Sequence, residues 1–189
     1  MQTRPVRDRD DLKAVLRTAF TYLGGVRHRL VGTAAACLQG VDLPVGDIDL
    51  LVQHRRDVDA IAHALAGFPC IAEPRWLPAS HQYFAAHLID GVEFSVSTVE
   101  TPCLDDGWEC QGPGPWQHYV TVDGIDCVRL ELRLTTELLR GRSDRYKPLL
   151  AHLKTHGADL ELLHRSVTTR EVPETLAYLI GPVPSAPKG

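Results

Sequence analysis

The chain has 189 residues, of which 44% are hydrophobic and 23% charged, so it can bury a core and is not a disordered polymer. A net charge of −4 and a pI near 6.1 exclude a general attraction to nucleic acid or anionic membranes. No apolar run approaches the roughly 20 residues that span a bilayer, and no apolar segment follows the N-terminal charges, so we expect neither an anchor nor a signal peptide.

The five cysteines indicate neither a disulfide framework nor a zinc site. Their number is odd, and no two of them have CxxC spacing. Cys103, Cys110 and Cys127 could join His118 around zinc, but this spacing matches no zinc finger. We therefore expect free thiols and a reducing, cytoplasmic location.

Hydrophobic periodicity in the first third of the chain predicts alternating helices and short strands. Leu12, Leu16 and Phe20 recur at helical spacing, with Asp8 or Asp10 placed to cap that helix. The predicted elements are a helix over 10–23, a strand over 29–31, a helix over 33–39, a strand over 47–52, a helix over 57–66 and a strand over 68–72.

The middle of the chain carries two hairpin signals. Pro74 and Pro78 are expected to break the chain after the strand over 68–72. Asp-Gly pairs at 90–91 and 123–124 then separate alternating runs. The predicted hairpins are 82–89 with 92–99, and 118–122 with 125–128. The Pro- and Gly-rich segment 100–116 is too long for a simple connection, and loops of that length are often functional.

From residue 130 the pattern is helical. The predicted helices are 130–139, 143 to about 155 with Ser143 or Asp144 as its cap, and one that begins over 159–163. The fold class is therefore α+β: a small mixed β-sheet with helices on one side and a C-terminal helical segment. The expected divisions are a core over 1–129, the helical segment over 130–181 and a disordered tail over 182–189.

Asp47-Ile48-Asp49 begins a strand that continues into aliphatic residues. Because side chains alternate along a strand, the two aspartates point to one face and Ile48 to the other. Two carboxylates this close repel each other unless a cation lies between them. Hard oxygen ligands suit Mg²⁺, so the triplet predicts a magnesium site.

A Gly32-Thr33 pair, a short helix-prone segment, a loop and then Asp-x-Asp on a strand resemble the signature of the polymerase-beta-type nucleotidyltransferase superfamily. The likeness is greatest to its small bacterial branch, which includes aminoglycoside, lincosamide and toxin-type nucleotidyltransferases. The resemblance implies that Gly32 and Thr33 contact the triphosphate of an NTP. It also implies that Asp47 and Asp49 bind two Mg²⁺ ions, with a third carboxylate supplied by a later strand.

Glu93 is the candidate for that third carboxylate, because it lies on the polar face of the strand over 92–99. The superfamily position is more often Asp than Glu. The alternative for Glu93 is a solvent-facing residue on a half-exposed sheet. The alternative for Thr33 is a plain N-cap at a strand-to-helix turn.

A cationic cluster follows the predicted sheet. It consists of Arg140, Arg142, Arg145 and Lys147. In the family that the chain resembles, a basic helix and loop at this point face the nucleotide phosphates, which arginine grips with two donors. The alternative is that these cations complement the C-terminal dipole of the preceding helix.

Some further side chains are weaker candidates. Glu131 and Glu137 could act as a general base on an acceptor hydroxyl, as in related aminoglycoside enzymes. Trp108, Trp116 and Tyr119 could stack on a base or an acceptor, although loop aromatics more often close the edge of a core.

The function expected from the resemblance is a metal-dependent nucleotidyltransferase. It would transfer NMP, AMP above all, from an NTP to a hydroxyl of a small molecule and release pyrophosphate. A small, cationic acceptor suits the acidic pI and the carboxylate-rich site. The alternatives are a toxin-type enzyme acting on tRNA or protein, and a degenerate binding module of the same fold. The oligomeric state is not predicted.

Overall fold

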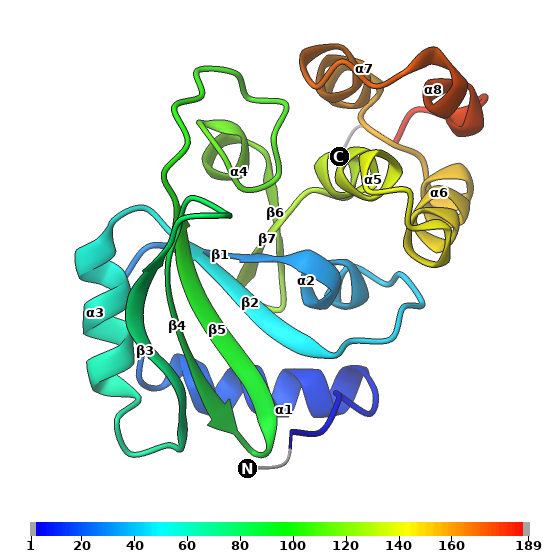
Figure 1. Cartoon of the computed structure of the whole chain (residues 1–189). Helices are drawn as coiled ribbons and strands as arrows, with labels where there is room; N and C mark the ends of the chain where they lie inside the picture. Colours follow the sequence, from blue (N-terminus) through cyan, green and yellow to red (C-terminus); the bar gives the residue numbers. More distant parts are fainter. Residues whose placement is uncertain (1–2, 187–189) are drawn as a thin grey trace.

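The computed structural model describes residues 3–186 and has the predicted α+β architecture (Figure 1). The strands are β1 (His28–Val31), β2 (Asp47–Val52), β3 (Cys70–Leu77), β4 (Gln82–Ile89), β5 (Val92–Val99), β6 (Tyr119–Val122) and β7 (Ile125–Val128). The helices are α1 (Arg9–Phe20), α2 (Gly32–Leu38), α3 (Arg55–Ala64), α4 (Gly114–Gln117), α5 (Leu130–Leu139), α6 (Ser143–His156), α7 (Leu160–Thr169) and α8 (Glu174–Ile180).

The seven strands form one mixed sheet in the order β3-β4-β5-β2-β1-β7-β6. β2 lies near its centre, antiparallel to β1 and parallel to β5. The β2–β5 register places Asp47 beside Glu93 and Asp49 beside Ser95. Paired residues of neighbouring strands point to the same face, so the polar side chains of both strands share one side of the sheet.

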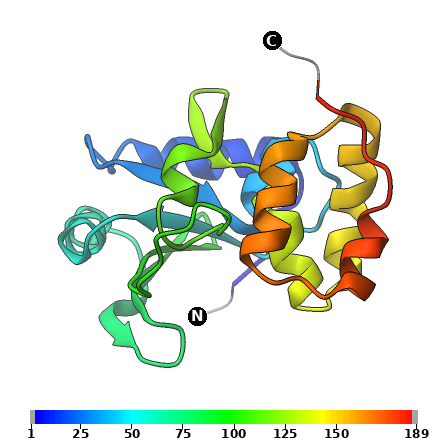
Figure 2. The same cartoon turned by 90° about the horizontal axis from the view of Figure 1, so that it is seen from above.

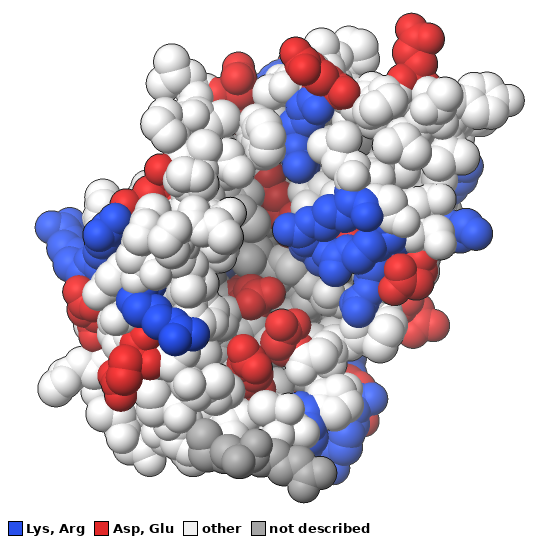
Figure 3. All heavy atoms as spheres, in the orientation of Figure 1, with Lys and Arg blue, Asp and Glu red and all other residues white. Residues whose placement is uncertain are grey.

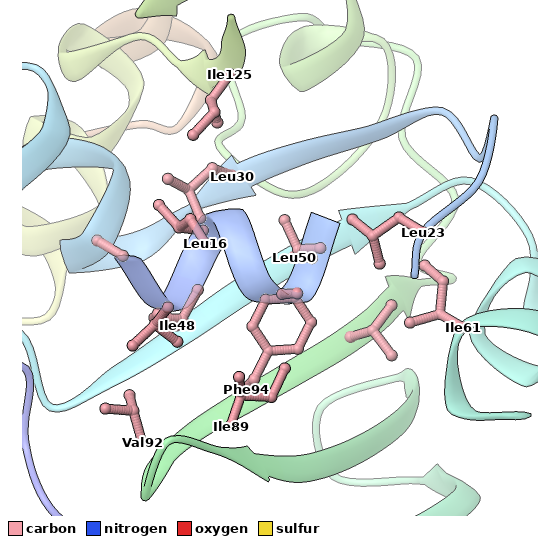
Figure 4. Packing of buried hydrophobic residues seen from close by; sticks show 14 of the residues in the cluster. Leu16, Leu23, Leu30, Ile48, Leu50, Ile61, Ile89, Val92, Phe94 and Ile125 are labelled. Atoms are coloured by element: carbon pink, nitrogen blue, oxygen red, sulfur yellow. The ribbon is translucent and has the colours of Figure 1, made fainter. Parts of the chain in front are cut away.

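The alternation along β2 determines which face is the core. Ile48 and Leu50 are fully buried against α1, together with Phe94 of β5 (Figure 4). Each side chain of this size contributes roughly 1.5–3 kcal/mol on burial. Asp47 and Asp49, which alternate with Ile48 and Leu50 along β2, therefore point to the opposite face. The predicted in-and-out pattern of both strands is confirmed.

The first helix begins with the predicted cap. Asp8 is the N-cap residue of α1, and its Oδ1 accepts a hydrogen bond of 2.8 Å from the Asp11 N–H. Leu12 and Leu16 of α1 are fully buried against the sheet. α3 packs on the same face through Val58 and Ile61.

The C-terminal helices form a separate group beside the sheet (Figure 2). α5 joins this group to the core, because Leu134 and Leu138 pack with Ala36 of α2, whereas Leu132 packs with Val31 and Leu51. The division into a core and a helical segment remains a prediction.

The expected disordered tail lies partly within the described residues. Residues 184–186 make backbone hydrogen bonds to Ala158. Residues 187–189 lie outside the described part of the chain.

Four local predictions differ from the structure. Pro74 lies inside β3 rather than ending a strand, because β3 is an edge strand whose register shifts around it, and such strands tolerate proline. α6 has Arg142 at its N-cap position, so neither Ser143 nor Asp144 caps it. The short helices α4 and α8 were not predicted, since each begins beside a proline and, unlike the alanine-rich α2, has no run of strong helix formers.

No helix within residues 3–186 combines the length and the hydropathy needed to cross a membrane.

Candidate active site

A cavity of about 520 Å³ lies on the open face of the sheet, between its central strands and the C-terminal helices. Its size is in the range of small-molecule sites. The charged residues that line it are Asp47, Asp49, Glu109, Arg133, Arg140, Arg142, Arg145 and Arg170. Acidic side chains gather inside this hollow, and Lys and Arg side chains gather along one edge (Figure 3).

Asp47 and Asp49 form the acidic floor. Asp49 is partly buried, and its Oδ1 accepts a hydrogen bond of 2.6 Å from the Ser95 hydroxyl. Burial and, to a lesser degree, the neighbouring charge of Asp47 raise the pKa of Asp49 to about 6, although the Ser95 hydroxyl opposes the shift. Asp47 is exposed. A cation bound here would relieve the repulsion that this pKa reflects.

Gly32 has to be glycine for two reasons. Its φ of +72° is a conformation that other residues adopt only with strain. A Cβ atom on Gly32 would also lie 3.0 Å from Asp49 Oδ2. The missing side chain therefore leaves space beside the carboxylate oxygen.

Thr33 lies one residue further into α2. Its Oγ1 accepts a hydrogen bond of 3.2 Å from Arg145, which also donates to the Pro44 carbonyl at 2.9 Å. The N-cap of α2 is Val31, so the interpretation of Thr33 as the cap is wrong. The structure thus brings Thr33 and Arg145, 112 residues apart, into direct contact at the cavity wall.

Glu93 lies beside Asp47 at the rim of this face and is partly buried. It is not one of the residues that line the cavity. Within residues 3–186, no three or more His, Cys, Asp or Glu side chains are grouped in a way that could hold a metal ion. The described structure therefore presents two carboxylates at the floor rather than an assembled set of three.

Glu109, which lies in the long loop, was not predicted. Its side chain is only 4% exposed, and Oε1 accepts hydrogen bonds of 3.1 Å from both the Gly32 N–H and Arg133. Burial alone would raise the pKa of Glu109, but the Arg133 charge and the Gly32 N–H together hold it below its ordinary value. The Gly32 amide expected to face a phosphate therefore already has an anionic partner.

Three arginines of the basic wall surround one carboxylate. Glu137 is fully buried and lies 2.6 Å from Arg133, 2.6 Å from Arg142 and 3.7 Å from Arg140. Because Glu109 also pairs with Arg133, two negative charges oppose three positive ones, and the wall keeps an excess of one positive charge. Lys147 is exposed and does not line this cavity.

Arg170, at the C-terminal end of α7, is a second unpredicted residue. It stacks over Trp108 with its guanidinium carbon 4.4 Å from the ring centroid, and it donates to the Thr136 hydroxyl at 2.6 Å. Within residues 3–186 it forms no ion pair, although the charge of Glu109 acts on it, and its Nε has no hydrogen-bond acceptor. Its positive charge is therefore available to an anion in the cavity.

The weaker candidates are engaged elsewhere. Glu131 is buried and accepts hydrogen bonds from Arg129 and from the Asp159 N–H, and Glu137 is surrounded by arginines. Neither lines the cavity, so the geometry does not favour a general base at these positions. Trp116 and Tyr119 both stack against Arg29.

The oxygen donors at the floor suit Mg²⁺ chemically. Mg²⁺ is usually held by one or two carboxylates and completes its coordination with water and substrate phosphates. Asp47 and Asp49 supply two carboxylates on one face of β2, and Gly32 leaves room beside one of them. The facing arginines supply the charge that a triphosphate needs.

The chain matches neither a protein-family model nor a curated protein. Solved structures do resemble it. One is described as a putative nucleotidyltransferase from Thermotoga maritima, with a TM-score of 0.56 and 22% identity over 78% of this chain and 96% of that one. Another is described as a putative nucleotidyltransferase from H. pylori, with a TM-score of 0.49 and 15% identity over 91% and 81%. A third is JHP933 from Helicobacter pylori, with a TM-score of 0.48 and 16% identity over 91% of this chain and 79% of that one.

Identities this low carry the fold and not a substrate. The Thermotoga structure is matched along almost its whole length, so the likeness is one of overall fold. The chain therefore has the nucleotidyltransferase-like fold that its Gly-Thr and Asp-x-Asp motifs predict.

Proposed function

We propose that the chain is a metal-dependent nucleotidyltransferase that transfers NMP, AMP above all, from an NTP to a hydroxyl of a small molecule. The observation that carries this proposal is one cavity with a carboxylate pair on its floor and five arginines on its walls. A metal-bound triphosphate is a ligand that needs both: carboxylates for the cation and arginines for the phosphates.

Asp47 and Asp49 would hold Mg²⁺, with Glu93 at the rim as a further candidate. The metal would supply charge neutralisation for the leaving pyrophosphate and activation of the attacking hydroxyl. Arg170 and Arg145 would bind and orient the phosphate oxygens, with Thr33 held beside Arg145. The rate enhancement would come from positioning and electrostatics.

The transfer balances without a redox partner. The acceptor oxygen forms a bond to the α-phosphorus while the bond from that phosphorus to the bridging oxygen breaks. Pyrophosphate leaves, and the hydroxyl proton passes to solvent.

A small acceptor is favoured over tRNA or protein. Arg140 and Arg142, whose side chains are 56% and 42% exposed, pair with the buried Glu137, and Arg145 contacts Thr33. The cluster that would give a nucleic acid its basic surface is thus largely directed to the cavity. A salt-dependent gel shift with tRNA at submicromolar concentration would instead support the macromolecular acceptor.

Isothermal titration of the four NTPs, with Mg²⁺ and with EDTA, tests the proposal. We expect Mg²⁺-dependent binding to the wild type and at least tenfold weaker binding to Asp49→Asn. The matched control is Asp90→Asn, which removes one carboxylate at an exposed turn whose positive φ asparagine tolerates. A folded wild type that binds none of the four NTPs would overturn the proposal.

A further inference from the structure

A second, larger cavity continues from the first along the open face of the sheet. Its volume is about 1070 Å³, and it lies beneath the long loop over 100–117. Leu51, Val99 and Cys110 line both cavities, so the two cavities adjoin and share part of their walls. A molecule bound in the second cavity would therefore lie beside the proposed transfer site.

The floor of the second cavity begins two residues beyond the acidic floor. Asp49 and Leu51 lie on the same face of β2, and alternate residues of a strand are about 7 Å apart. Leu51 is only 2% exposed, so the shared boundary of the two cavities is formed by the half-buried Val99 and Cys110 that pack against it. The second cavity therefore begins within a small molecule's length of the Asp49 carboxylate.

The chemistry of the second cavity differs from that of the first. Among the described residues that line it, none is Asp or Glu, whereas Arg27 carries a positive charge. His54 also lines this cavity. Arg27 is exposed and has no ion-pair partner within residues 3–186. Its guanidinium carbon lies 5.3 Å from the ring centroid of Trp116, which holds the cation beside an aromatic surface.

The rest of the lining is largely apolar. Pro102 and Pro113 present carbon surface beside the exposed Leu104, and the lining also includes the amide side chains of Gln53 and Gln117. Such a surface accommodates a ring or an aliphatic body and offers hydrogen bonds to neutral polar groups. It has no carboxylate to receive the ammonium groups of a polycation.

From these observations we infer that the second cavity binds the acceptor, and that the acceptor is an aromatic or apolar hydroxyl compound bearing an anionic group. The inference rests on the proposed function for the reaction itself. It replaces the expectation of a cationic acceptor. The acidic floor, which suggested that a cationic acceptor is attracted, would be occupied by the metal and the triphosphate. The acceptor would instead lie beside the positive charge of Arg27.

Three phenols of one size and different charge test this acceptor class. They are 4-hydroxyphenylacetate, which is an anion at pH 7.5, 2-(4-hydroxyphenyl)ethanol, which is neutral, and tyramine, which is a cation. Saturation-transfer NMR titrations in EDTA and without nucleotide measure binding without transfer. We expect the anion to bind at least tenfold more tightly than the cation, with the neutral compound between them.

Variants at one position identify the cavity. Arg27→Gln should reduce the preference for the anion and Arg27→Glu should reverse it. The control is Arg56→Glu, which makes the same charge change at a side chain 81% exposed that lines neither cavity, and it should keep the preference. Equal binding of the three phenols, an unchanged preference in Arg27→Glu, or displacement of all three by ATP would overturn the inference.

Titration of ATP and Mg²⁺ in the same samples separates the two proposals. If ATP binds but the phenols show no charge preference, the proposed acceptor class is wrong and the proposed transfer function is kept. If the charge preference follows Arg27 but no NTP binds, the transfer function falls and the cavity stands as a site for aromatic anions.

Discussion

At the scale of single residues, Asp49 connects the stability of the fold with its proposed chemistry. Folding raises the pKa of this carboxyl from 3.8 to about 6. When folding raises the pKa of a carboxyl, the folded state loses stability as the pH rises from about 4 to about 6. Above pH 6 this loss of folding free energy is complete. Two pKa units correspond to about 3 kcal/mol.

We therefore expect Asp49→Asn to be more stable than the wild type in EDTA at pH 7.5, by about 2 kcal/mol. The reason is that asparagine keeps a hydrogen-bond acceptor for Ser95 but carries no charge. The gain should shrink towards zero near pH 4, where the wild-type carboxyl is protonated. Urea unfolding at both pH values measures it, and a less stable variant at pH 7.5 would contradict the assigned cause.

Gly32 is the second residue with a required identity. Gly32→Ala should cost about 1–3 kcal/mol, because alanine is strained at a φ of +72° and its Cβ would approach Asp49 Oδ2. The control is Gly46→Ala, where a Cβ meets nothing within 4 Å. Thermal unfolding of both variants checks this, and equal effects at the two positions would show that Gly32 has no special role.

At the scale of elements, the long loop is held to the site by one buried ion pair. Glu109→Gln should destabilise the chain by about 2–3 kcal/mol, because Arg133 would lose an anionic partner while keeping Glu137. Glu161→Gln removes a carboxylate that is 84% exposed in its pair with Arg165 and should cost at most about 1 kcal/mol. Chemical denaturation compares them, and hydrogen exchange of the Gly32 amide reports the loop contact. Unchanged exchange of that amide in Glu109→Ala, which removes both acceptor oxygens, would contradict it.

The first helix depends on one acidic side chain. Asp11 is 6% exposed, pairs with Arg7 and Arg4, and accepts a hydrogen bond from the Arg7 N–H. The hydrogen bonds from Arg7 and Arg4 hold the pKa of Asp11 well below its ordinary value. A carboxyl with a lowered pKa contributes stability that is complete above about pH 4 and is lost as the pH falls further.

Asp11→Asn should therefore cost about 1–3 kcal/mol at pH 7, as expected for hydrogen bonds between charged groups near a surface. The difference from the wild type should decrease below pH 4. Urea unfolding at pH 7, 4 and 3 tests this, and a constant difference across the three would exclude an electrostatic origin.

Local patterns predicted the elements with strong periodicity. Strand alternation placed Asp47 and Asp49 on one face, and the Asp90-Gly91 turn identified the β4–β5 hairpin. The pairing of β2 with β5 was not itself predicted, since the resemblance implied only that a later strand supplies a third carboxylate. Pro74 was misjudged, because its tolerance depends on the edge position of β3, which only the assembled sheet determines.

Contacts between distant segments were beyond the reach of such patterns. Glu109 lies in a loop without periodicity, 77 residues from the Gly32 amide that it binds. Arg170 enters the cavity only because α7 packs beside α5. The sole sequence signal for Glu109 was a charged residue between Trp108 and Cys110, which alone is too weak to predict a buried carboxylate.

At the scale of the whole molecule, the proposed site needs both parts of the chain. The central strands provide the carboxylates, and α5, α6 and α7 with their flanking residues provide the arginines on the other side. Fields of opposite sign across one cavity favour a ligand that carries a cation and an anion together. A metal–nucleotide complex is such a ligand.

Electron paramagnetic resonance of Mn²⁺, used in place of Mg²⁺, tests this claim most directly. The titrations would include and omit the non-transferable α,β-methylene analogue of ATP. We predict that the analogue and the protein together bind Mn²⁺ at least tenfold more tightly than either alone, and that Asp47→Asn/Asp49→Asn abolishes the gain. Equal Mn²⁺ binding by the folded double variant in the presence of the analogue would contradict the assignment of this cavity as a metal–nucleotide site.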